Sequence, residues 1–154
     1  MEECIMMMRN IFIVSLVLGA SYCAAAETYE SCPPPAAIKV ARNVYTATTS
    51  DNEGEWTGIA RGPDDGNIKE FSSATFDPPQ LDNDGTVRSP EIQCSYELAN
   101  GSHMNLRYIP RSPLPGLRVD PGSWRRKSGP HDLDYYECTE PAAWRCRFVV
   151  VRRS

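Results

Sequence analysis

The sequence has no hydrophobic run long enough to cross a bilayer, which needs about 20 apolar residues. Its longest apolar stretch, residues 11–18, is short and is interrupted by Ser15. Long helices are disfavoured as well, because 13 prolines and 10 glycines are spread through 154 residues and both types destabilise helix interiors. We therefore expect neither a transmembrane segment in the mature chain nor a helical bundle.

Metal-binding motifs are also scarce. His103 and His131 are the only histidines, they are isolated, and no two cysteines have the C-x-x-C spacing of a zinc site. Residues 82–85 begin like a calcium loop, but Val87 and Gln93 stand where such a loop needs glycine and glutamate. We expect no cofactor, and we interpret residues 82–85 as a solvated turn, with weak calcium binding as the alternative.

The N-terminus has the three parts of a secretory signal peptide. Arg9 gives positive charge, residues 11–18 form the apolar part, and residues 24–26 are small alanines. We predict cleavage after Ala26, which leaves residues 27–154 as one domain in the periplasm or outside the cell. Acidic residues at positions 2 and 3 are unusual in such a signal and suggest a start at Met6, Met7 or Met8. Lipidation of Cys23 is disfavoured, because bulky Tyr22 precedes it.

Removal of residues 1–26 takes away two of the six cysteines. The four that remain are Cys32, Cys94, Cys138 and Cys146. In an exported chain, four cysteines predict two disulfides, for which the sequence allows three pairings. We favour Cys32 with Cys94 and Cys138 with Cys146, the second bond closing a short loop across the last two strands.

Most of the mature chain has the composition of β-strands separated by turns. We predict strands over residues 44–49, 55–60, 68–76, 92–99, 102–109, 117–119, 133–139 and 144–152, and a helical turn within 36–41. Asn100-Gly101 between two alternating runs indicates a hairpin with a type I′ turn, which we place at the centre of the sheet. The expected core includes Trp56, Tyr96, Leu106, Trp144 and Phe148. The predicted fold is a small antiparallel β-sandwich or partly open barrel with at most one short helix.

The charge is unevenly distributed, although the net charge is only −4. Residues 27–100 hold five basic and thirteen acidic side chains, whereas residues 101–154 hold ten basic and five acidic ones. An acidic chain is not expected to bind nucleic acid. A basic patch could nevertheless bind an acidic protein, a glycan or a lipid head group, and its candidate members are Trp124, Arg125, Arg126, Lys127, Arg145 and Arg147. Alternatively, the two halves neutralise each other in one folded sheet.

An ordered set of short motifs resembles a family of small exported bacterial proteins known only as a domain of unknown function. These motifs are Cys32-Pro33-Pro34-Pro35, Trp56-Thr57-Gly58, residues 71–76, Cys94-Ser95-Tyr96, Trp124, residues 133–139 and Cys146-Arg147-Phe148. The resemblance implies a single exported domain with two disulfides. It implies no activity, substrate or catalytic residue.

The function is left as two hypotheses. We favour a non-enzymatic binding or inhibitor-like protein, because a small cross-linked domain loses little entropy on association. The alternative is a secreted hydrolase with a loop site near His103 and His131. Ser102 and His103 are neighbours on one strand and therefore point to opposite faces, which argues against a direct nucleophile and base pair.

Overall fold

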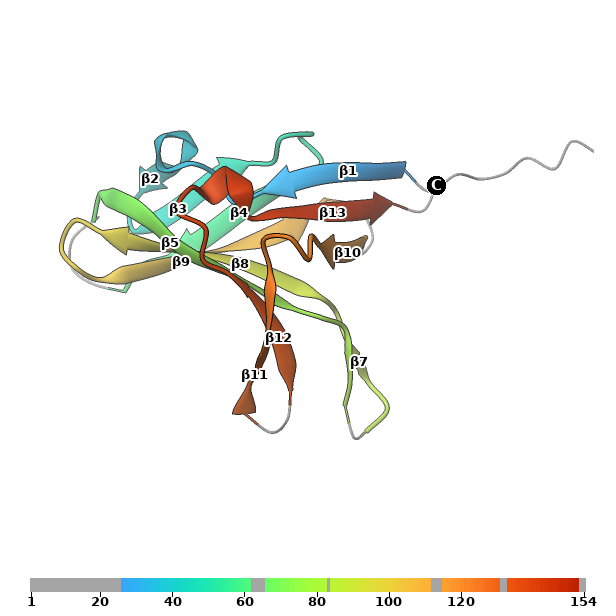
Figure 1. Ribbon diagram of the computed structural model, residues 1–154. Coiled ribbons are helices and arrows are strands. Elements are labelled where there is room, and N and C mark those ends of the chain that lie inside the picture. The colour runs from blue at the N-terminus through green and yellow to red at the C-terminus, as the bar shows by residue number, and fades with distance from the viewer. Residues whose placement is uncertain (1–25, 62–65, 83, 112–114, 131–132, 153–154) are drawn as a thin grey trace, which may run out of the picture.

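A computed structural model describes residues 26–61, 66–82, 84–111, 115–130 and 133–152. Its strands are antiparallel and form an eight-stranded sheet, a three-stranded sheet and a two-stranded ribbon, none of them closed into a barrel (Figure 1). The predicted β-sandwich is confirmed. Residues 1–25 of the proposed signal peptide, which include Cys4 and Cys23, lie outside the described residues, as does His131. The last residue of the proposed signal peptide, Ala26, is the first residue of β1 (Ala26–Ser31).

The eight-stranded sheet has the order β11-β12-β5-β8-β9-β4-β3-β2. These strands are β2 (Lys39–Ala41), β3 (Val44–Thr48), β4 (Gly54–Ile59), β5 (Ile68–Asp77), β8 (Glu91–Leu98), β9 (His103–Pro110), β11 (Arg125–Ser128) and β12 (Asp134–Cys138). The predicted hairpins at residues 44–60 and 92–109 are both present, and β8 and β9 lie at the centre of the sheet as expected. Along both strands every second side chain is buried, so the apolar alternation determines which face of the hairpin meets the core.

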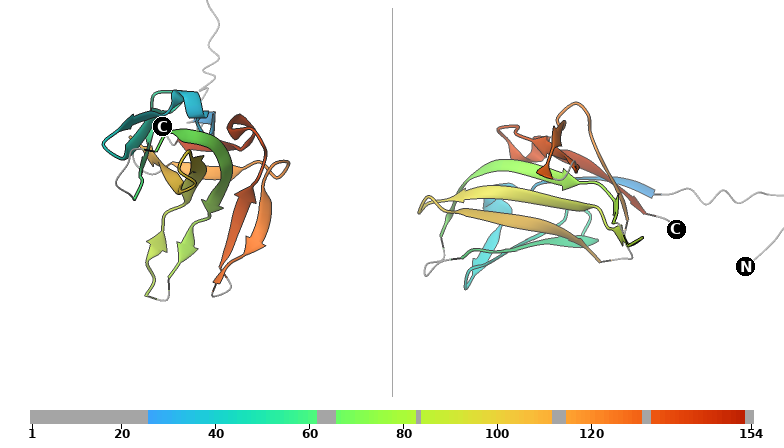
Figure 2. Two further views of the ribbon diagram at one scale, coloured as in Figure 1. Left: turned by 90° about the vertical axis from the view of Figure 1, so that its left-hand side faces the viewer. Right: turned by 90° about the horizontal axis from the view of Figure 1, so that it is seen from below.

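The three-stranded sheet has the order β1-β13-β10 and covers part of the larger sheet (Figure 2). Its strands are β1 (Ala26–Ser31), β10 (Gly116–Val119) and β13 (Arg147–Arg152). Phe148 of β13 packs between the sheets against two aromatic rings of the larger one, with ring centroids 6.0 Å from Trp56 and 5.5 Å from Tyr108. The core therefore lies between the two sheets and joins them into one unit.

One hairpin turn differs from the predicted geometry, and another hairpin was not predicted. At the β8–β9 connection only Gly101 has a positive φ, and its N–H donates to the carbonyl of Leu98. This is a three-residue loop with a left-handed glycine, so the prediction of a type I′ turn was wrong there. Instead, Arg42 and Asn43 between β2 and β3 both have positive φ, which a two-residue type I′ turn requires. The helical turn predicted in residues 36–41 is limited to the 3-10 helix η1 (Pro35–Ala37).

The last predicted strand begins three residues late. Residues Ala143–Arg145 form the 3-10 helix η3, and the backbone of Cys146 breaks the extended geometry before β13. This turn removes the alternation that would have directed Trp144 inward, and the Trp144 side chain is 59% exposed. The prediction of Trp144 as a core residue was therefore wrong, whereas Trp56, Tyr96, Leu106 and Phe148 are buried.

Two hairpin arms extend beyond the sandwich from the same end of the large sheet (Figures 1 and 2). One arm consists of β11 and β12. The other consists of the end of β5, the start of β8 and the ribbon that connects them, which is formed by β6 (Gln80–Leu81) and β7 (Val87–Arg88). Strand β12 pairs with β5 only from Tyr136 to Cys138, and beyond that point the two arms separate. Beyond Tyr136, the two arms are therefore not paired with each other.

Candidate binding cleft

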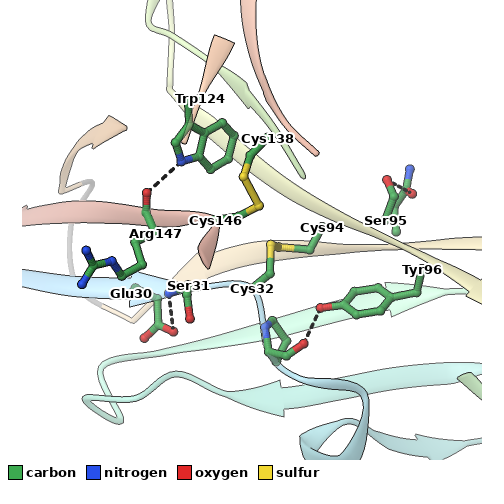
Figure 3. The surroundings of a disulfide bond; sticks show 12 residues. Glu30, Ser31, Cys32, Cys94, Ser95, Tyr96, Trp124, Cys138, Cys146 and Arg147 are labelled. Carbon is green, nitrogen blue, oxygen red and sulfur yellow. Dashed lines mark hydrogen bonds between the residues drawn. A yellow bond between two sulfur atoms is a disulfide. The ribbon is translucent and has the colours of Figure 1, made fainter. Parts of the chain in front are cut away.

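Both predicted disulfides are present and lie in the core (Figure 3). Cys32 bonds Cys94, which attaches the segment after β1 to central strand β8. Cys138 bonds Cys146, which joins the end of β12 in the large sheet to the residue just before β13 in the small one. The second bond thus crosses between the sheets rather than between paired strands, and it anchors the β11–β12 arm at its base.

The predicted basic residues lie close to this disulfide but do not form one exposed patch. Trp124 is 2% exposed, and its Nε1 donates to the Arg147 carbonyl over 2.8 Å, so its ring is part of the core and not of the surface. Arg125 donates to two backbone carbonyls in the preceding turn. Trp124 therefore cannot contribute an exposed ring to anion binding.

The other members of the patch have partners of their own. Arg126 forms an ion pair with Asp134, Lys127 with Glu137 at 3.5 Å, and Arg145 with Glu140 at 3.3 Å. The guanidinium of Arg147 lies 5.7 Å from the centre of the Tyr29 ring. These contacts reduce the free positive charge of the surface, and the anion-binding hypothesis stays a prediction.

The described geometry gives little support to a hydrolase site near His103 and His131. His103 is exposed on β9, opposite Glu97 of β8. The neighbouring Ser102 hydroxyl donates to the Asn100 side chain over 2.6 Å, which fixes the turn. Ser102 thus acts as a turn residue here, and His131 lies outside the described part of the chain.

A polar cleft of about 310 Å³ lies between the two arms. The β5–β8 arm contributes Asp77, Gln80, Arg88 and Glu91, and the β11–β12 arm contributes Pro130, Leu133, Asp134 and Tyr135. Sequence reasoning missed this site. Asp77 follows the strand predicted over residues 68–76 and precedes two prolines, and nothing in the sequence pairs it with residues near position 134.

Three carboxylates give the cleft its charge. Asp77 and Glu91 are directly opposite each other on β5 and β8. Glu91 accepts from Arg107 Nε over 3.0 Å and from the Gln93 amide, while Asp134 pairs with Arg126. Burial, together with the Glu91 charge, raises the pKa of Asp77, and Arg88 only partly offsets this effect. The Asp77 carboxylate is thus the group of the cleft whose negative charge is least compensated.

The wall of the cleft also contains a buried amide. The Oε1 atom of Gln80 is inaccessible to solvent and has no hydrogen-bond partner among the described residues. Arg88 of the neighbouring strand pairs with Asp82 at 3.1 Å, and its guanidinium is held at the outer end of the arm. In the described residues, no three histidine, cysteine or acidic side chains are close enough to hold a metal ion.

Comparisons with known proteins identify a family but no activity. Residues 26–149 match a family described as "Protein of unknown function (DUF3757)". No curated protein and no solved structure matches the chain. Among the described residues, none of the helices has the length and apolar character needed to span a membrane.

Proposed function

Because the chain belongs to this family, whose description gives no function, we propose a function from the structure: the protein is an exported, non-enzymatic binding protein. The observation that carries the proposal is the cleft between the two arms, which contains a poorly compensated carboxylate. Two intramolecular disulfides support export, since such bonds persist in oxidising compartments. In this proposal the ligand is a positively charged group, such as a lysine or arginine side chain of a partner protein.

The charge preference follows from the state of Asp77. Its pKa is raised because burial and Glu91 disfavour the ionised form. A cation that enters the cleft would favour the ionised form, so binding would recover energy that the free protein loses. Leu133 and Pro130 at the edge of the cleft offer apolar contacts for the methylene groups of a long side chain.

The arms are held in place before any ligand binds. The Cys138–Cys146 disulfide fixes the base of the β11–β12 arm, and in the other arm the pairing of β5 with β8 continues as far as Asp77 and Glu91. Ion pairs within the arms, such as Arg126 with Asp134, hold the lining side chains in position. A cleft that is already ordered loses less conformational entropy on association, which favours affinity.

The test compares the oxidised wild-type protein with two charge-reversed variants in a pull-down from cell envelope extract and culture medium. Asp77→Lys reverses the charge inside the cleft. Glu70→Lys makes the same change at an exposed site on β5, where the side chain is 59% exposed. We expect a partner to be retained by wild type and Glu70→Lys and lost by Asp77→Lys. Retention of the same proteins by all three would contradict the proposal.

A second candidate is the secreted hydrolase. The specific observation in its favour is the pair of Asp77, with its raised pKa, and Glu91, which is held by Arg107, because two carboxyls with different proton affinities suit acid and base roles. The test is a panel of hydrolase substrates assayed with wild type, Asp77→Asn and His103→Ala. Turnover that either substitution abolishes would favour the hydrolase and argue against the binding protein.

A further inference from the structure

The edge of the small sheet lies beside an apolar groove on the other side of the large sheet from the polar cleft. The groove, of about 410 Å³, is lined mostly by apolar side chains, among them Phe76, Leu117, Val119 and Tyr136, together with Arg118. Leu117 and Val119 belong to β10 and are only half-buried, although they pack against the core. The groove is therefore an incompletely covered part of the space between the sheets.

Strand β10 has one open edge in the described structure. It pairs with β13 through residues 116–119, and no other strand pairs with it. Leu117 and Val119 of the same strand line the groove. β10 is the last strand of its sheet, so its backbone N–H and C=O groups on the side away from β13 have no strand partner among the described residues. Backbone groups of this kind are a template for the addition of another extended chain.

Three other strand edges are protected by cations, shortness or a covering segment; β10 itself has four residues and one cation, Arg118. Strand β11 carries three consecutive cations, and β2 is only three residues long. The outer side of β1 is contacted by Ser50, whose N–H and hydroxyl bind the Glu30 carboxylate and whose hydroxyl also reaches the Tyr29 carbonyl. Charges, shortness and covering loops all hinder edge pairing. Beside β10 there is instead an apolar groove.

We propose that β10 and this groove form a strand-addition site for an extended apolar segment of a partner protein. The segment pairs with the open edge of β10 through its backbone and extends the three-stranded sheet over the uncovered part of the eight-stranded one. Every second side chain of the segment then enters the groove beside the half-buried side chains of Leu117, Val119 and Tyr136. Backbone pairing supplies affinity, and the groove selects apolar side chains at alternate positions.

An extended peptide fits this place better than a lipid chain does. Any ligand that fills the groove beside β10 removes water from the open backbone edge. An acyl chain offers no hydrogen-bonding group in exchange, so the N–H and C=O groups would lose their water partners without compensation. A strand replaces those partners one for one.

The test begins with selection from a phage-displayed library of random dodecapeptides on oxidised wild-type protein. We expect enriched sequences with apolar residues at every second position. A synthetic peptide of the enriched sequence is then titrated by fluorescence anisotropy, and amide hydrogen exchange is measured with and without it. We expect slower exchange for amides of residues 116–119. No enrichment, or protection only elsewhere in the chain, would overturn the proposal.

Backbone pairing is tested without changing the protein. Two peptides with identical side chains are N-methylated at alternate residues, in one register or in the other. One register blocks the amides that pair with β10 and should weaken binding at least tenfold, whereas the other blocks amides that face away and should leave binding nearly unchanged. Equal binding by both peptides would show that only their side chains are recognised, and it would refute strand addition.

The groove is tested with a matched pair of protein variants. Leu117→Glu introduces a charge beside the groove, and Ile59→Glu introduces the same charge at a site on the outer face that is 72% exposed. We expect at least tenfold weaker peptide binding for Leu117→Glu and an unchanged affinity for Ile59→Glu. An unchanged affinity in a folded Leu117→Glu protein would contradict the assignment. This site does not depend on the polar cleft, so Asp77→Lys should bind the peptide like wild type.

Discussion

Trp144 and Phe148 lie close together in the sequence but have opposite environments. Phe148 is fully buried and contacts Trp56 and Tyr108, whereas Trp144 is 59% exposed and contacts the guanidinium of Arg145. We expect Phe148→Ala to lower the free energy of unfolding by about 3–5 kcal/mol and Trp144→Ala by about 1 kcal/mol or less. Urea unfolding of both variants measures this difference. A similar loss for both would place Trp144 in the core after all.

Asp51 connects the β3–β4 turn to the end of β13. Its carboxylate accepts from Arg152 over 2.6 Å, from the Thr49 hydroxyl and from the Glu53 backbone. Burial alone would raise the pKa of Asp51, but these hydrogen bonds outweigh it and lower the pKa to about 2. The ionised carboxylate therefore stabilises the folded state above the ordinary pKa of 3.8, and this contribution is lost as the pH falls through about 2.

This pH dependence can be measured with a neutral variant. At pH 7, we expect Asp51→Asn to cost about 2 kcal/mol of unfolding free energy, and at pH 2.5 we expect the difference from wild type to fall below about 1 kcal/mol. Glu53→Gln is the control, since it keeps the backbone donor and changes only an exposed side chain. A loss for Asp51→Asn that is the same at both pH values would show that shape rather than charge is responsible.

At the scale of single residues, the sequence predicts burial where apolar side chains alternate regularly along a strand. The alternation in residues 92–109 predicts every buried position of β8 and β9, including Tyr96 and Leu106. It fails at Trp144 because one short 3-10 turn, which has no distinctive composition, shifts the chain before β13. Composition misleads at Trp124, where an indole beside three cations suggests a surface position but is buried, with its N–H bonded to the Arg147 carbonyl.

At the scale of elements, strands with a buried face are predictable and strands without one are not. β3, β4, β5, β8 and β9 were all expected. β1, β2 and β11 were missed, and their residues are mostly exposed, so no apolar alternation marks them. Their strand geometry comes from the partner strand: β1 is extended because β13 lies beside it, and β11 because it pairs with β12.

The two disulfides close loops of very different length. Cys32 and Cys94 are 62 residues apart, and Cys138 and Cys146 are 8 apart. From loop-closure entropy we expect the Cys32→Ala/Cys94→Ala protein to lose about 4 kcal/mol of unfolding free energy and the Cys138→Ala/Cys146→Ala protein about 2.5 kcal/mol. Denaturant unfolding of both variants tests the order. A larger loss for the short loop would mean that anchoring the β11–β12 arm matters more than chain entropy.

At the scale of the whole molecule, the oppositely charged halves of the sequence meet in the fold. Arg118 of β10 pairs with Glu27 of β1 at 2.8 Å, Arg107 with Glu91 at 3.0 Å, and Arg152 with Asp51. Each of these pairs joins the acidic half to the basic half, as the alternative to the anion-binding hypothesis predicts. The candidate cleft could not be predicted in the same way, because its two walls come from arms that only the complete sheet brings together.

Ion pairs within the basic half lead to an expectation for anionic ligands. We expect the oxidised protein to pass through immobilised heparin at 0.15 M NaCl without retention, because Arg126, Lys127 and Arg145 are each paired with an acid. Retention that decreases as NaCl is raised would restore the basic patch as a recognition surface. In that case Lys127→Glu should elute at lower salt than wild type.

The pairing of β1 with β13 joins the two ends of the described chain, with Ala26 opposite Arg152. A chain that emerges N-terminus first, from a ribosome or through a pore in a membrane, can form the hairpins of the large sheet one after another. It cannot complete the small sheet until its last strand has emerged, because that strand lies between β1 and β10. Until then Phe148 and Val150 are absent from the core, so stable folding has to wait until β13 has emerged.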